Sequence, residues 1–165
     1  ALLESINSTD LPSEKIINKA MKVTLLEGRL DLRFYHGRKW LFDVAHNHDS
    51  AKILGDFLSK QKFRRCIFIF GIMSDKDIHN VIDEISIYAA HWFFPSLEVT
   101  RSIEPSELTK IIEEKNRGSC SASKTIAQSI NMAIDSTSKD DLIVITGSFY
   151  IVSPALCYLK ESATN

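Results

Sequence analysis

The chain has 165 residues and a formal net charge of -1, from 20 basic and 21 acidic side chains. Hydrophobic residues make up 44% and charged residues 25% of the sequence, which are values of a globular domain and exclude a largely disordered chain. The basic residues are spread along the chain, so charge gives no support for a nucleic-acid or anionic-membrane partner. The longest apolar run, residues 66–71, is far too short to cross a bilayer.

The cysteines and the N-terminus indicate where the protein works. Cys66, Cys120 and Cys157 are widely spaced and form neither a CxxC motif nor a zinc-ligand pattern with histidine, which favours a reducing cytoplasm. The first residues show no signal peptide. The absence of a starting methionine is consistent with a processed protein or with a piece of a longer chain.

Hydrophobic periodicity predicts helices and strands that alternate along most of the chain. The expected helices carry apolar stripes, and the fourth is started by Pro105 in its favoured first-turn position. In chain order the prediction is a helix around residues 16–21, strands over 31–36 and 39–44, a helix over 51–58, a strand over 65–71, a helix over 78–85, a strand over 91–95, a helix over 105–112, a short polar strand over 119–122, a helix over 126–134, a strand over 141–146 and a helix over 152–159.

Two features of the strands predict how the sheet is built. Only His36, Gly37 and Arg38 separate the first two strands, which is enough for a hairpin, so these strands should be antiparallel. Residues 66–70 and 142–145 are apolar at every position, so helices should cover both faces of the sheet there. The sequence therefore predicts an α/β fold: a Rossmann-like open twisted sheet, mostly parallel with one antiparallel edge strand, and helices on both faces.

Polar side chains gather where three predicted strands end, in the turns 43–49, 71–77 and 146–150. Open parallel sheets bind ligands beyond the carboxyl ends of their strands, so these turns form the candidate site. A simpler reading is that the acids and serines there cap the helices that follow, which would be Asp49 or Ser50 for one helix and Asp75 or Asp77 for the next.

Several kinds of site are excluded by motif. His46 and His48 are two positions apart, share no helix face and have no evident third ligand, so no metal site is predicted. The chain contains no GxxxxGK[ST] phosphate loop, no GxGxxG dinucleotide fingerprint and no GxSxG hydrolase elbow. Its acids are also not placed as in a phospho-receiver domain.

Taken together, the turns resemble the C-terminal domain of folylpolyglutamate synthase/dihydrofolate synthase, of the Mur ligase group, in its bacterial bifunctional form. Residues 41–47, Leu-Phe-Asp-Val-Ala-His-Asn, are similar to the family's Asp-Gly-Ala-His-Asn-Pro, with Val44 for glycine and His48 for proline. Residues 70–77 resemble its Phe-Gly-x-x-x-Asp-Lys-Asp, and residues 146–150 resemble its Gly-Ser-Phe/Leu-Tyr. Gly28 and Arg29 look like the Pro-Gly-Arg that opens the domain, with Glu27 for proline.

The resemblance implies that residues 1–25 are an interdomain connection with a first helix and that residues 26–165 are the glutamate ligase domain. An N-terminal ATPase domain, carrying the phosphate loop and the Mg²⁺ ligands, would be absent from this chain, which would be inactive alone. The implied reaction uses ATP to convert the carboxylate of dihydropteroate or of a reduced folate into an acyl phosphate. The amine of L-glutamate then attacks it to form an amide.

The resemblance also implies roles for six residues. Arg29 and His46 would be catalytic residues that contact ATP, and Asp43 would bind its ribose hydroxyls. Glutamate would be bound by Asn47, Lys76 and Ser148, with Lys76 pairing with a carboxylate.

Two other interpretations share these observations. One is a free-standing α/β module that binds a small ligand or a protein at the same strand ends. The other is a Mur-type ligase with a different acceptor, against which the Asp-Lys-Asp and Gly-Ser-Phe-Tyr pieces favour the folate branch.

Overall fold

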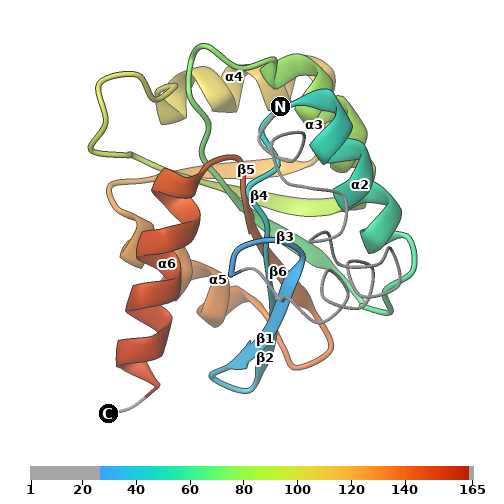
Figure 1. Cartoon of the computed structure of the whole chain (residues 1–165), viewed down its shortest axis with the longest axis vertical. Coiled ribbons are helices and arrows are strands. Elements are labelled where there is room, and N and C mark those ends of the chain that lie inside the picture. Colours follow the sequence, from blue (N-terminus) through green and yellow to red (C-terminus); the bar gives the residue numbers. More distant parts are fainter. Residues whose placement is uncertain (1–26, 164–165) are drawn as a thin grey trace, which may run out of the picture.

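The structure is a computed structural model and describes residues 27–163. Its elements form one mixed sheet with helices on both sides, as Figure 1 shows. The predicted first helix and the predicted connection over residues 1–25 lie outside the described residues.

Six strands build the sheet in the order β1-β2-β6-β3-β4-β5. Only β1 and β2 pair antiparallel, and every other neighbouring pair is parallel. The predicted fold class is therefore confirmed, including the antiparallel edge. The strands are β1 (Asp31–Tyr35), β2 (Arg38–Phe42), β3 (Cys66–Phe70), β4 (Ala89–Pro95), β5 (Ser119–Ser123) and β6 (Leu142–Thr146).

The hairpin between β1 and β2 turns over two residues, His36 and Gly37. Both have positive φ, 50° and 70°, which is the backbone of a type I′ turn. This turn twists in the same sense as the strands that it joins, so it closes a two-residue hairpin without splaying them. The predicted hairpin follows from this turn, with Tyr35 opposite Arg38.

The helices divide between the two faces of the sheet (Figure 1). On one face lie α2 (His48–Leu58), α3 (Ile78–Ile85) and α4 (Pro105–Lys115), with the short helix η2 (Ser86–Tyr88) after α3. The other face is covered by α5 (Ile126–Ser136) and α6 (Phe149–Ser162). Strands β3 and β6 are buried at every position because helices pack on both of their faces, as their unbroken apolar sequences predict.

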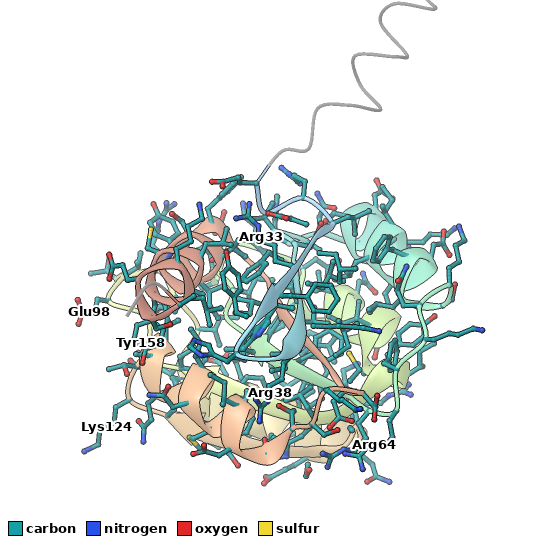
Figure 2. All side chains as sticks on the ribbon, turned by 90° about the horizontal axis from the view of Figure 1, so that it is seen from below. Arg33, Arg38, Arg64, Glu98, Lys124 and Tyr158 are labelled. Atoms are coloured by element: carbon teal, nitrogen blue, oxygen red, sulfur yellow. The ribbon has the colours of Figure 1, made fainter. Side chains whose placement is uncertain are left out.

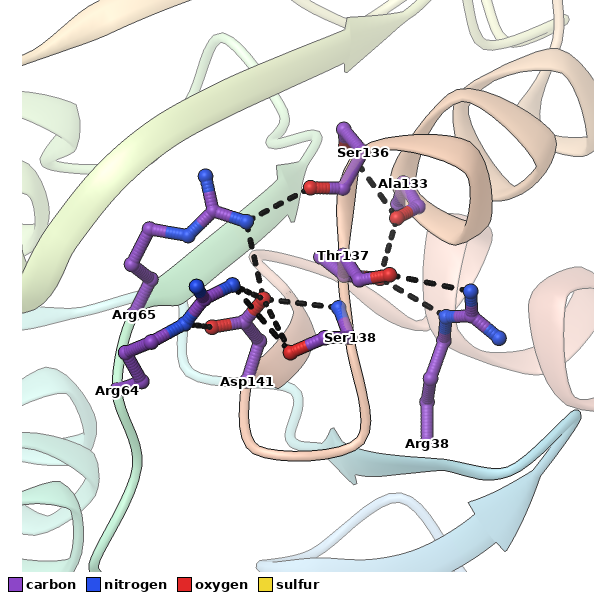
Figure 3. Close-up of polar contacts among 8 residues, drawn as sticks. All are labelled: Arg38, Arg64, Arg65, Ala133, Ser136, Thr137, Ser138 and Asp141. Carbon is purple, nitrogen blue, oxygen red and sulfur yellow. Dashed lines mark hydrogen bonds and ion pairs between the residues drawn. The ribbon is translucent and has the colours of Figure 1, made fainter.

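The amino-terminal edge of β6 is held by a buried carboxylate (Figure 3). The side chain of Asp141 is fully buried and accepts hydrogen bonds from Arg64 Nε at 3.0 Å, from Arg65 Nη2 at 3.0 Å and from the Ser138 backbone N–H at 2.9 Å. These donors, Arg64 first, hold the pKa of Asp141 well below its ordinary value. The network ties the start of β3 to the start of β6, at the edge opposite the predicted site.

Charged side chains are spread around the outline of the molecule, as Figure 2 shows. Arg33 lies beside the hairpin, whereas Arg64 and Lys124 lie at separate places on the far side. Among the described residues, none of the helices combines the length and the apolar character that crossing a bilayer requires.

Candidate functional site

Four turns that follow parallel strands meet at the carboxyl edge of the sheet and line a cavity of about 230 Å³, called here the strand-end cavity. Parallel strands end at the same edge, so residues far apart in sequence are brought together there. Three of the six predicted site residues line it: His46, Lys76 and Ser148. The other lining residues are Met73, Asp75, Arg101, Gly147, Phe149 and Tyr150.

Asp43 directly follows β2 and acts as an anchor. One of its carboxylate oxygens accepts from the Leu30 backbone N–H at 2.9 Å and the other from the Ala45 backbone N–H at 2.8 Å. Burial, with only 6% of the residue exposed, raises the pKa of Asp43, and these two hydrogen bonds oppose the shift. The contacts fix the turn that carries Arg29 against the end of β2. The predicted ribose contact stays a prediction.

His46 and Asn47 occupy the turn between β2 and α2. His46 Nδ1 donates to the Val44 carbonyl at 2.8 Å, so its Nε2 is the ring atom left to accept a proton or a hydrogen bond. Asn47 is the N-cap of α2, because its Oδ1 accepts from the Ser50 backbone N–H at 2.9 Å. The expectation of Asp49 or Ser50 as the cap is wrong: the helix begins at His48, three residues earlier than predicted, and Ser50 is the reciprocal partner that accepts from the Asn47 N–H at 3.2 Å.

His48 turns away from this site. Its Nδ1 lies 3.5 Å from Oε1 of Glu84 on α3. Within residues 27–163, no group of three or more histidines, cysteines and acids could hold a metal ion.

Arg29 lies outside the lining but beside it. Its guanidinium carbon is 5.6 Å from the ring centroid of Phe149, a cation–π geometry, and Phe149 lines the strand-end cavity with 56% of its surface exposed. The turn that presents Arg29 has positive φ at Gly28 and Leu30, 74° and 46°. A side chain on Gly28 would also meet Val152 of α6 at 2.9 Å, so glycine fits both the backbone and the space.

Lys76 belongs to the turn after β3. Its Nζ lies 2.7 Å from Asp75 Oδ2, and this hydrogen bond is the main reason that the pKa of Asp75 falls below its ordinary value. Asp77 caps α3 by accepting from the Asn80 backbone N–H, which confirms one of the two predicted caps. Lys76 is therefore a half-buried residue of the cavity wall that forms an ion pair with Asp75.

Gly147 and Ser148 form the turn between β6 and α6. Gly147 has φ of 113°, and a Cβ there would contact the backbone of Gly71, with the Gly71 carbonyl carbon at 2.9 Å, so only glycine fits. Ser148 is 7% exposed, and its hydroxyl oxygen is buried without a hydrogen-bond partner among residues 27–163. The Thr146 hydroxyl, two residues earlier, is also buried and unpartnered. Buried hydroxyls are rarely left unsatisfied, so each calls for a physical explanation.

Arg101, Phe149 and Tyr150 were not predicted as individual site residues. Arg101 lies in the loop between β4 and α4, and the Ser74 N–H of the neighbouring turn donates to its carbonyl at 2.8 Å. Arg101 is not part of a motif that directly follows a strand, so its sequence gives no sign of a role in the site. Its place beside the cavity becomes visible only from the pairing of its loop with the turn after β3.

A second cavity, of about 450 Å³, lies between the loop after β4, the start of α5 and the face of α6. Its charged lining residues are one acid, Glu98, and one base, Lys124, and Figure 2 shows both on the same side as Tyr158. Tyr150 lines both cavities, so the second cavity adjoins the first.

Comparison with known proteins gives the family. The model of the family described as "Mur ligase, glutamate ligase domain" matches residues 28–149. The chain belongs to this family. This Mur ligase domain is 33% identical over 146 residues to the dihydrofolate synthase/folylpolyglutamate synthase of Buchnera aphidicola subsp. Acyrthosiphon pisum, a match that covers 87% of the chain and 34% of the relative.

Solved structures share the fold of this Mur ligase domain. Escherichia coli FolC in complex with DHPP and ADP superposes with a TM-score of 0.82 at 22% identity, over 97% of this chain and 38% of that one. A bifunctional folylpolyglutamate synthase/dihydrofolate synthase with Mn, AMPPNP and L-glutamate bound superposes with a TM-score of 0.78 at 23% identity, over 92% of this chain and 36% of that one. The chain thus spans about a third of the length of the relatives that it matches.

Proposed function

We propose that this chain is the glutamate ligase domain of an ATP-dependent folate synthase, which adds L-glutamate to dihydropteroate or to a reduced folate. In this proposal, residues 1–25 connect the domain to an N-terminal domain that holds the phosphate loop and the Mg²⁺ ligands. The relative named dihydrofolate synthase/folylpolyglutamate synthase supports the proposal. So do the solved structures of similar fold, one with ADP bound and another with Mn, AMPPNP and L-glutamate bound.

The observation that carries the proposal is the buried, unpartnered hydroxyl of Ser148 beside Lys76. Ser148 and Lys76 line the same cavity, and in the part of the chain that the structure describes the Ser148 oxygen has no hydrogen-bond partner. A different staggered rotamer of serine redirects its hydroxyl without moving the backbone. A ligand carboxylate between the two residues would supply the missing acceptor and would pair with the Lys76 ammonium.

Lys76 must then serve two carboxylates, that of Asp75 and that of the ligand. An ammonium has three donor hydrogens, so the contact with Asp75 at 2.7 Å leaves donors for a second partner. Asp75 also holds the lysine chain in place at the wall before the ligand arrives. The simple alternative, a solvated lysine paired only with its neighbour, predicts no effect of Lys76 on glutamate use.

At the β2 side of the cavity, His46 in its lining and Arg29 beside it would act on the phosphates. The Arg29 guanidinium, fixed over the Phe149 ring, would contact ATP phosphates and stabilise the charge that develops as the γ-phosphoryl group leaves. His46 Nε2, whose orientation is set by the Nδ1 bond to Val44, would contact phosphate or the incoming amine. When bound, ATP supplies the phosphoryl group that activates the acceptor carboxylate. The residues of this chain bind, orient and neutralise charge.

Asn47 fits its proposed glutamate contact less well than Lys76 and Ser148. Its side-chain oxygen is engaged in the α2 cap, and Asn47 does not line the strand-end cavity. A role for it would use the amide nitrogen. Asp43 would have two roles in this proposal: its carboxylate holds the Leu30 N–H, and with it the turn that carries Arg29, and it would also contact the ribose.

The test is glutamate-dependent ADP release by the full-length gene product with ATP and Mg²⁺, and with dihydropteroate or tetrahydrofolate as acceptor in parallel. We expect release with at least one acceptor, and none from the 165-residue chain alone. Lys76→Ala should raise the KM for L-glutamate at least about tenfold, as loss of a charged hydrogen bond does. Lys110→Ala, which removes an exposed lysine on α4, is the matched control. A folded full-length protein that releases no ADP with either acceptor would exclude the folate assignment.

A further inference from the structure

The residues of the strand-end cavity follow the order of the strands. Because the sheet order is β2, β6, β3, β4, the lining runs from His46 through Ser148 and Lys76 to Arg101. Neighbouring strands lie about 4.8 Å apart, so the turns after β6 and β4 leave the sheet roughly 10 Å from each other. The cavity therefore has one end at His46, next to Arg29, where the proposed function puts the phosphates, and a far end at Arg101.

The loop that carries Arg101 is fixed to the neighbouring turn by its backbone. The Ser74 N–H donates to the Arg101 carbonyl at 2.8 Å, and the Ile103 N–H donates to the Ile72 carbonyl at 3.0 Å. Between them, Met73 and Ser102 form a β-bridge. Arg101 is thus held at a constant place relative to Lys76, although its side chain is exposed.

The charges of the lining do not balance. Asp75 is its acid and is paired with Lys76, whereas no hydrogen bond or ion pair within residues 27–163 engages the Arg101 guanidinium. After the hydrogen bond from Lys76, the charge of Arg101 also lowers the pKa of Asp75, so the guanidinium acts on this part of the cavity. The far end consequently carries a positive charge that a ligand carboxylate would neutralise.

We propose that Arg101 binds the side-chain carboxylate of L-glutamate and makes the site select glutamate over glutamine. This inference rests on the proposed function. The reacting amine must lie near the phosphates, so the carboxylate beside it falls at Ser148 and Lys76, and the side chain extends toward Arg101. A guanidinium presents paired donors that match both oxygens of a carboxylate, and an uncharged amide cannot replace that partner.

The test uses the full-length gene product and three amino acids: L-glutamate as substrate, with L-glutamine and L-isoglutamine, the α-amide of glutamate, as competitors. Arg101→Gln should raise the KM for glutamate about tenfold, equal to about 1.4 kcal/mol, and leave kcat nearly unchanged. The Ki of isoglutamine, which keeps the side-chain carboxylate, should rise by a similar factor. The Ki of glutamine, which lacks it, should stay within about twofold, which is below the size of a charged hydrogen bond.

Two variants complete the test. Arg101→Lys keeps the charge and should lose less affinity for glutamate than Arg101→Gln, and Lys110→Gln, an equal loss of charge on α4, should leave all three constants unchanged. An unchanged KM for glutamate in Arg101→Gln, or a rise in the Ki of glutamine without one for isoglutamine, would overturn the role of Arg101 while the proposed function stood. Absence of glutamate-dependent ADP release by the unsubstituted protein would overturn both.

Discussion

Removing the hydroxyl of Ser148 should stabilise the domain and at the same time weaken the binding of L-glutamate. The hydroxyl oxygen is buried and unpartnered, and Ser148 is 7% exposed. An unsatisfied buried polar group costs about 1–3 kcal/mol. Ser148→Ala should therefore raise the free energy of unfolding by about 1 kcal/mol, near the low end of that range because the removed oxygen leaves a small void. In the full-length enzyme the same change should raise the KM for L-glutamate.

Two hydroxyls near the site provide matched controls. Thr146 is also buried with an unpartnered hydroxyl but does not line the strand-end cavity, so Thr146→Val should stabilise the domain without any change in KM. Ser50 is the opposite case, because its hydroxyl accepts from the backbone N–H groups of His46 and Asn47 at 3.1 and 3.2 Å. Ser50→Ala should cost about 1 kcal/mol, as the loss of a helix cap does.

Urea unfolding of the 165-residue chain, followed by circular dichroism, measures the free energy of unfolding. ADP release by the full-length protein measures the KM for L-glutamate. Ser148→Ala and Thr146→Val should then raise the free energy of unfolding, whereas Ser50→Ala should lower it. Destabilisation by Ser148→Ala of more than about 1 kcal/mol, the typical net value of one hydrogen bond, would mean that the hydroxyl has a partner within the domain. A stabilised variant with an unchanged KM would refute its role in binding.

Three further predictions concern the anchors of the site and of the sheet. Asp141→Asn should destabilise the chain by about 2 kcal/mol near pH 7, since it weakens the charged hydrogen bonds of a buried carboxylate to two half-exposed arginines. Because the pKa of Asp141 is lowered by folding, its contribution is fully present above the ordinary carboxyl pKa and is lost as the pH falls through the folded value, so the difference in stability between the two proteins should begin to shrink below about pH 4 and keep shrinking as the pH falls further. Gly147→Ala should reduce both the stability and the activity, because the added Cβ meets the Gly71 backbone; wild-type stability would contradict the close approach. Phe149→Ala removes the ring beneath Arg29 and should lower ADP release more than it lowers stability, which activity and urea titration measured together would check.

Most of the fold could be predicted because the hydrophobic pattern marks both the buried and the half-buried strands. The apolar runs of β3 and β6 predicted their burial on both faces, and the short connection His36-Gly37-Arg38 predicted the antiparallel edge. The strand β5 gave the weakest signal, because Ser119–Ser123 is an edge strand that is buried only at its end, and its sequence is Ser-Cys-Ser-Ala-Ser. The boundaries were off by up to three residues: α6, predicted over residues 152–159, spans Phe149–Ser162, and Asp43, placed within a strand, follows it.

The site was predicted where a motif follows directly on a strand end, and missed elsewhere. His46, Lys76 and Ser148 come from such turns and meet in one cavity. Arg101 stands six residues beyond β4, so its position depends on the bridge between Met73 and Ser102, which local sequence does not encode. The capping role of Asn47 was also hidden, since an amide that caps a helix and one that binds a ligand look alike in sequence.

The contacts that hold the turn at residues 27–30 determine which parts of the domain move together. Glu27 is held by Lys160 of α6 at 2.8 Å and by Arg33 of β1 at 3.0 Å, and the Leu30 N–H is held by Asp43. Arg29 lies between these fixed points and is therefore part of the same rigid body as the sheet. In the proposed ATP-dependent enzyme, Arg29 would therefore reach the phosphates by movement of the domain as a whole instead of by rearrangement of its own loop.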